Sequence, residues 1–125
     1  MATGGLTLTT VNLSAADPGE LARFYARLLE WPIVAEEEHW VLLRPPGQEV
    51  GISCQTEDDY RRPTWPAGAG DQQMMVHLDI RCDDLDEAVG HALDCGATLA
   101  EHQPQEDVRV CLDPAGHPFC LWVVT

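Results

Sequence analysis

The stretch Thr10-Val11-Asn12-Leu13-Ser14 recurs as Met75-Val76-His77-Leu78-Asp79, and each copy precedes an acid-capped helix pattern and three short strand patterns. Asn12 aligns with His77, and Ser53 aligns with Cys120 at nearly the same spacing, so the connecting loops differ by only a residue or two. The chain is therefore one strand–helix–strand–strand–strand unit that occurs twice. We expect equivalent strands of the two copies to face each other, with function between the copies.

The length of the chain predicts one domain, residues 1–125, because a copy of about 60 residues would bury too little apolar surface alone. Within it we expect a first module at residues 6–57, a linker at 58–71 and a second module at 72–125. The linker carries Tyr60 and Trp65 among its prolines and glycines. These two aromatics either pack on the outside of the sheet or form a lid over the cleft, and the sequence favours neither.

Both helices have recognisable boundaries in the sequence. Asp17 is placed to cap the first helix, Pro18 suits its first position, and Pro32 is expected to end it. Acidic residues begin the second helix, and Gly96 is expected to end it. Alternation and turn residues predict strands at residues 6–14, 33–37, 40–44 and 50–56 in the first copy, and at 72–82, 98–102, 108–112 and 118–124 in the second.

The charge and the cysteines restrict the class of protein. The formal net charge of −14 disfavours binding to nucleic acids and to anionic membranes, because both would repel the chain. Five cysteines without a CxxC spacing predict reduced thiols rather than disulfides or a zinc knuckle. The first ten residues do not resemble a signal peptide, and no apolar run is long enough for a membrane helix. We therefore expect a cytoplasmic protein.

Strand alternation also separates two faces of the predicted sheet. One face is apolar and suits packing under the helices. The other is mixed and holds an aromatic side chain among polar ones, which is the composition of a small-molecule pocket. A sheet with one solvated face is the alternative, and the duplication favours the pocket because it brings two mixed faces together. The mixed face consists of Asn12, Ser53, Gln55, His77, Asp79, Cys120 and Trp122.

In this arrangement the chain resembles the vicinal oxygen chelate superfamily, the group of glyoxalases, bleomycin-resistance proteins and extradiol dioxygenases. The resemblance rests on the paired units, on Phe24-Tyr25 in the first helix, on Val76-His77-Leu78-Asp79, and on the turn Asp113-Pro114-Ala115-Gly116-His117-Pro118. It implies an α+β fold in which two βαβββ modules form a curved mixed sheet around a cleft. It also implies a homodimer that binds a small molecule.

The resemblance further implies where a metal ion would be held. Metal-dependent members place His or Glu on the first, fourth, fifth and eighth strands, where this chain has Asn12, Ser53, His77 and Cys120. Only His77 is a ligand of the usual type, and a His/Cys pair is short of the three protein ligands that catalytic sites use. We therefore expect neither a metal nor a cofactor.

Two functions fit these residues. The first is a metal-independent binding protein that holds a small molecule between the modules and stacks it on aromatic side chains. An acidic chain would favour a cationic ligand. For Trp40, a position in the core is an equally good alternative to ligand binding. The expected ligand-binding residues are Asn12, Trp40, Ser53, Gln55, Trp65, His77, Cys120 and Trp122.

The second function is a metal-free isomerase or lyase that uses His77 as an acid or base, with Asp79 beside it. Two residues apart on one strand, His77 and Asp79 are expected to be too far from each other for an ideal dyad. A histidine that merely bonds a neighbouring strand is the simpler interpretation. For Cys120 we expect a buried, unreactive thiol, and for His117 a structural role in its turn.

Overall fold

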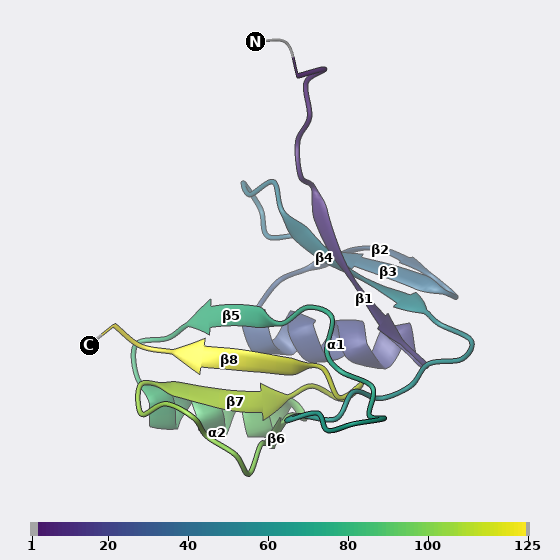
Figure 1. Cartoon of the computed structure of the whole chain (residues 1–125). Coiled ribbons are helices and arrows are strands. Elements are labelled where there is room, and N and C mark those ends of the chain that lie inside the picture. Colours follow the sequence, from purple (N-terminus) through teal and green to yellow (C-terminus); the bar gives the residue numbers. More distant parts are fainter. Residues whose placement is uncertain (1–2, 125) are drawn as a thin grey trace. The chain divides into compact units, whose positions relative to one another are not determined.

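A computed structural model describes residues 3–124 of the chain, which form two compact units that divide between Asp58 and Asp59 (Figure 1). The second unit thus includes the segment 59–71, which the sequence analysis assigned to a linker. Neither helix within the described residues has the length and apolar character needed to cross a membrane. The five cysteines all lie in this part of the chain and are free thiols.

The first unit is a mixed four-stranded sheet with one helix against strands β3 and β4. Its strands lie in the order β1-β4-β3-β2, with β1 and β4 parallel and the other neighbours antiparallel. The elements are β1 (Thr10–Ala15), α1 (Pro18–Leu29), β2 (Ile33–Glu37), β3 (Trp40–Leu43) and β4 (Gly51–Thr56).

Helix α1 begins as the sequence predicts and ends earlier. The Asp17 side chain accepts a hydrogen bond from the Glu20 backbone N–H at 3.1 Å, and Pro18 occupies the first turn. One face of the helix is buried through Leu21, Phe24, Tyr25 and Leu28. The rings of Phe24 and Tyr25 meet edge to face with centroids 4.8 Å apart. The helix ends at Leu29 because Glu30 adopts a left-handed conformation, so Pro32 is not the residue that stops it.

The second unit repeats the same architecture. Its sheet has the order β5-β8-β7-β6 with β5 and β8 parallel, and helix α2 packs on β7 and β8 (Figure 1). Asp84 caps the helix through the Glu87 N–H, and Gly96 ends it with a positive φ of 120°, as predicted. The elements are β5 (Leu78–Arg81), α2 (Leu85–Cys95), β6 (Thr98–Leu99), β7 (Val108–Leu112) and β8 (Pro118–Trp122).

The two equivalent units confirm the predicted duplication and the α+β class, and three expectations need correction. Each sheet is open and does not curl. The strands expected at residues 6–14 and 72–82 begin only at Thr10 and Leu78, because their partners β4 and β8 begin at Gly51 and Pro118. An extended segment without a neighbour forms no ladder. The strand expected at 98–102 is reduced to Thr98–Leu99.

A network of hydrogen bonds holds the start of the predicted linker against the turn before β8. The buried carboxylate of Asp113 accepts from the N–H groups of Ala115 and His117 at 3.0 and 2.9 Å. The Tyr60 hydroxyl donates to the Ala115 carbonyl at 2.6 Å and lies 3.4 Å from His117 Nε2. Arg62 Nη1 donates to the backbone carbonyl of Pro114 at 2.8 Å. Tyr60 therefore supports the turn before β8, and His117 is part of this turn.

Candidate functional site

Strand β8 directs its side chains to two faces of the second unit. Phe119 and Leu121 are buried on the side of helix α2, while Cys120 and Trp122 point to the opposite face. The register pairs Cys120 with Asp79 on β5 and Trp122 with Val108 on β7. These pairs share a face because side chains opposite each other in neighbouring strands point the same way.

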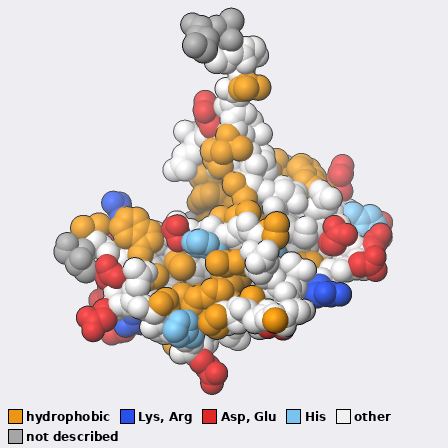
Figure 2. All heavy atoms as spheres, in the orientation of Figure 1, with side chains coloured by type: hydrophobic (Ala, Val, Ile, Leu, Met, Phe, Trp, Pro, Cys, Tyr) orange, Lys and Arg blue, Asp and Glu red, His pale blue; other side chains and the backbone are white. Residues whose placement is uncertain are grey.

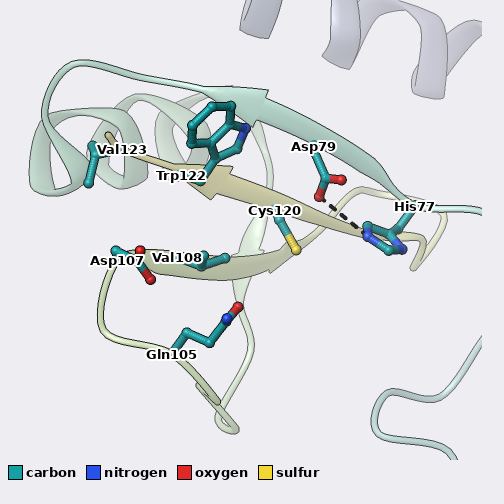
Figure 3. A pocket seen from close by; sticks show the side chains of 8 residues that line it. All are labelled: His77, Asp79, Gln105, Asp107, Val108, Cys120, Trp122 and Val123. Atoms are coloured by element: carbon teal, nitrogen blue, oxygen red, sulfur yellow. Dashed lines mark ion pairs between the residues drawn. The ribbon is translucent and has the colours of Figure 1, made fainter. Parts of the chain in front are cut away.

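A pocket of about 370 Å³ lies on this face (Figure 3). Strand β8 forms its floor, β5 and the residue before it form one wall, and β7 with the preceding loop forms the other. The volume falls in the range of small-molecule sites. Eight residues line it: His77, Asp79, Gln105, Asp107, Val108, Cys120, Trp122 and Val123.

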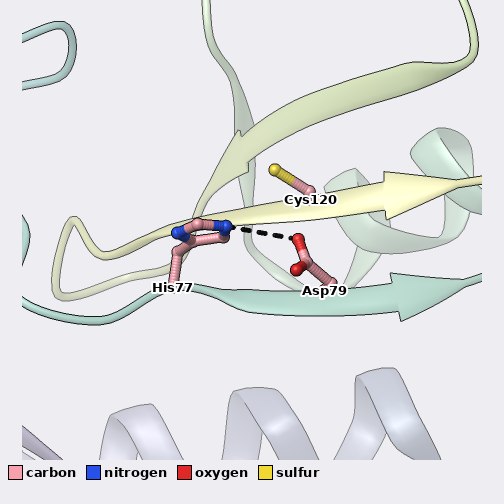
Figure 4. A group of neighbouring side chains, drawn as sticks. All are labelled: His77, Asp79 and Cys120. Carbon is pink, nitrogen blue, oxygen red and sulfur yellow. Dashed lines mark ion pairs between the residues drawn. The ribbon is translucent and has the colours of Figure 1, made fainter.

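Asp79 is the common acceptor for two polar groups of the pocket. Its Oδ1 lies 3.3 Å from His77 Nε2, and the two side chains are 62% and 40% exposed. Their spacing along the strand predicted a distance too great for an ideal dyad, although both could reach one ligand. His77 precedes β5, so its backbone is outside the ladder and its ring turns toward Asp79 (Figure 4). The result is an imidazole oriented by a carboxylate, the arrangement that acid–base catalysis uses.

The Cys120 thiol is the third member of this group. Burial raises its pKa, and the charge of Asp79 and the hydrogen bond that the thiol donates to Asp79 raise the pKa further. A raised pKa disfavours the thiolate and so lowers nucleophilicity. The thiol is half-buried rather than buried as expected, and its low reactivity stays a prediction. The pKa of the buried Cys111 thiol is likewise raised, to about 11, chiefly by burial.

The four positions at which the superfamily resemblance places metal ligands differ between the two units. Asn12 Nδ2 donates to Ser53 Oγ at 2.6 Å in the first unit, so these two neutral groups satisfy each other. In the second unit, the possible metal-ligand atoms of His77, Asp79 and Cys120 lie within 4.8 Å of one another. Asp79 is a third ligand beside the His/Cys pair considered from the sequence. Imidazole, carboxylate and thiolate are all ligand types that zinc takes, and the thiol would have to lose its proton to bind. The absence of a metal therefore stays a prediction from the sequence.

Other predicted ligand-binding residues lie outside this pocket. Trp40 and Gln55 are paired across β3 and β4 and line a separate hollow of about 520 Å³ in the first unit, with His39, Thr56 and Asp58. Trp65 is in the second unit, where its ring centroid lies 5.5 Å from that of His102 and away from the pocket lining. The second unit thus groups His77, Asp79, Cys120 and Trp122. Trp65 is not among the residues that line their pocket, and Trp40 and Gln55 belong to the first unit.

Four pocket residues were absent from the predicted set, namely Gln105, Asp107, Val108 and Val123. Val108 has a readable signal, because the antiparallel pairing of β7 with β8 places it opposite Trp122. Gln105 and Asp107 lie in the loop before β7, and Val123 follows β8. Strand alternation does not extend to the loop of Gln105 and Asp107. Val123 was expected inside a strand at 118–124, but β8 ends at Trp122, so alternation does not apply to it either.

Comparison with known families and structures agrees with this architecture. The model of the glyoxalase-like domain family matches residues 10–122. No curated protein has a sequence similar enough to match the chain. The family match supports the resemblance drawn from the sequence, and the solved structures below share the fold.

Three solved structures illustrate the likeness. A glyoxalase/bleomycin resistance protein/dioxygenase family enzyme from Burkholderia phytofirmans PsJN is 18% identical, with 96% of this chain and 100% of that chain covered and a TM-score of 0.72. A glyoxalase/bleomycin resistance protein from Albidiferax ferrireducens T118 is 17% identical, with coverages of 94% and 98% and a TM-score of 0.63. An antibiotic-binding protein from Streptomyces sp. CB03234 is 15% identical, with coverages of 99% and 100% and a TM-score of 0.62.

Proposed function

This chain belongs to the glyoxalase-like domain family, and we propose that it is a metal-independent protein that binds a small organic molecule. The observation that carries the proposal is the pocket of the second unit, where an indole, two aliphatic side chains and convergent polar groups share one face. The antibiotic-binding protein with the same fold supports it as a precedent. That the ligand is held in a cleft between the modules, in a cytoplasmic homodimer, stays a prediction from the sequence.

The proposal is tested by a binding screen on protein that has been dialysed against EDTA. Planar organic compounds of different charge are added one at a time, and binding is measured by isothermal titration calorimetry. We expect at least one compound to bind saturably to the metal-free protein. Cys120→Phe, which places a large ring on the floor of the pocket, should abolish that binding.

Val34→Phe is the matched control. Val34 is 53% exposed on β2 of the first unit, so this substitution adds the same ring outside the pocket lining. Binding that survives Cys120→Phe would show that the pocket is not the site. Binding that appears only after zinc or nickel is restored would contradict the metal-independent part of the proposal.

A second candidate function, a metal-free isomerase or lyase, is favoured by one observation. The 3.3 Å contact between His77 Nε2 and Asp79 Oδ1 orients the imidazole toward a role in proton transfer. Compounds that bind are incubated with the protein in D₂O and followed by proton NMR. An enzyme would exchange or convert its substrate, and His77→Gln would bind it without turnover. Equal turnover by His77→Gln, or none by the unmodified protein, would sink this alternative.

A further inference from the structure

We propose that the pocket of the second unit selects a flat organic cation, an aromatic ring system that carries a protonated or quaternary nitrogen. This inference rests on the proposed function and names its class of ligand. Three features of the pocket carry it: the balance of charge among the lining residues, the flat apolar surface beside the charges, and the fixed position of one acidic wall.

The lining residues favour a positive ligand. Two carboxylates stand on different walls, Asp79 on β5 and Asp107 in the loop before β7 (Figure 3). The eight lining residues, all within the described part of the chain, include neither lysine nor arginine. The two carboxylates outnumber the single basic side chain, His77, which contacts Asp79. The pocket lining is therefore acidic, and the net charge of −14 on the whole chain adds to this field.

An extended apolar surface lies between the two carboxylates. The Trp122 indole projects from β8 into the pocket, with Val108 opposite it in register and Val123 next along the chain (Figure 3). Figure 2 shows apolar side chains on this side of the molecule interspersed with acidic and histidine side chains. An indole face attracts a cation through its quadrupole and stacks on aromatic rings. A small inorganic cation would contact only the carboxylates and leave this apolar surface exposed to water, whereas a flat organic cation would cover it.

The wall that carries Asp107 is fixed before a ligand arrives. Arg109 Nη1 donates to the backbone carbonyls of Gln105, Glu106 and Val108 at 3.3, 3.0 and 2.8 Å. The Arg109 guanidinium therefore holds the loop, and Arg109 itself is not one of the residues that line the pocket. A held loop loses little conformational entropy on binding, which favours affinity. Arg109 thus makes the loop a rigid support for the Asp107 carboxylate.

The test compares three compounds with a similar three-ring outline on EDTA-treated protein near neutral pH. They are 9-aminoacridine as a cation, acridine as a neutral compound and anthracene-9-carboxylate as an anion. We expect 9-aminoacridine to bind about tenfold or more tightly than acridine, and anthracene-9-carboxylate to show no saturable binding. Asp107→Asn should weaken binding of 9-aminoacridine by about five- to tenfold, the effect of one lost ion contact at a partly exposed site.

Glu106→Gln is the matched control, because it removes the same charge from the neighbouring, exposed position outside the pocket lining. It should change the affinity for 9-aminoacridine by less than about twofold. Equal effects of Asp107→Asn and Glu106→Gln would show that only the general field acts, and would overturn the inference.

The outcomes separate this inference from the proposed function. If acridine or anthracene-9-carboxylate binds as tightly as 9-aminoacridine, and Cys120→Phe abolishes that binding, the cation preference is wrong and the small-molecule function stands. If none of the three compounds binds while other planar compounds do, the cation preference is again wrong and the small-molecule function stands. If zinc alone binds and displaces 9-aminoacridine, both the inference and metal independence are overturned.

Discussion

Replacing Asp113 with alanine is expected to unfold the second unit at markedly lower denaturant concentration. The Asp113 carboxylate is 1% exposed and accepts hydrogen bonds from the N–H groups of Ala115 and His117. Each charge-assisted bond contributes about 1.5 kcal/mol or more to stability, and alanine leaves both donors unpaired. The free energy of unfolding should therefore fall by about 3 kcal/mol.

Urea unfolding followed by far-UV circular dichroism and tryptophan fluorescence measures this effect. With a slope of about 2 kcal/mol per molar urea, the midpoint should fall by about 1.5 M. Asp113→Asn is the control, because its amide oxygen can still accept both hydrogen bonds, and its loss should be about 1 kcal/mol. A midpoint for Asp113→Ala within about 0.3 M of the unmodified protein, or losses equal for both variants, would refute the reasoning.

Three further predictions concern single groups. Alkylation of Cys120 by iodoacetamide should be slow near neutral pH, and Asp79→Asn should accelerate it, because Asp79 and burial raise the pKa of the thiol. The pKa of Tyr60 is raised to about 12, chiefly by burial and then by the nearby carboxylate, so the folded state keeps its proton when the unfolded chain loses it. Stability should therefore fall as the pH rises from about 10 to 12, less so in Tyr60→Phe, in urea titrations at several pH values. Asp17→Ala and Asp84→Ala should each cost about 1 kcal/mol in the same assay, because each removes a helix cap.

Controls make these results decisive. Peptide mapping by mass spectrometry assigns the alkylated cysteine, and Asp107→Asn should leave the rate at Cys120 closer to that of the unmodified protein than Asp79→Asn does, because only Asp79 accepts from the thiol. A slower rate in Asp79→Asn would contradict the assigned cause. An alkaline fall in stability as steep in Tyr60→Phe as in the unmodified protein would exclude Tyr60. Asp17→Asn and Asp84→Asn keep a capping oxygen and should retain most of the stability.

The sequence predicted well the features that depend on local pattern. Strand alternation placed Cys120 and Trp122 on the face opposite the helix, and the caps at Asp17 and Asp84 began both helices as expected. The strands predicted at 6–14, 72–82 and 98–102 began too early or ended too late because pairing partners, not propensity, decide where a ladder ends. The first helix ended early because Glu30 turned into the left-handed region before Pro32 was reached.

The site was predictable only in part for a similar reason. Residues in regular strands follow alternation, but His77 precedes β5, and its ring orientation depends on a tertiary contact with Asp79. Asp107 reaches the pocket from a loop whose course depends on Arg109 and three backbone carbonyls. No periodicity encodes such contacts, so the acidic wall of the pocket appears only in three dimensions.

The most direct test of a ligand site without metal in the second unit is an NMR titration of EDTA-treated, ¹⁵N-labelled protein with 9-aminoacridine. The account predicts the largest shifts at the amides of Asp79, Asp107 and Cys120 and at the indole N–H of Trp122. Shifts centred instead on the hollow that Trp40 and Gln55 line, or shifts that require added zinc, would contradict it.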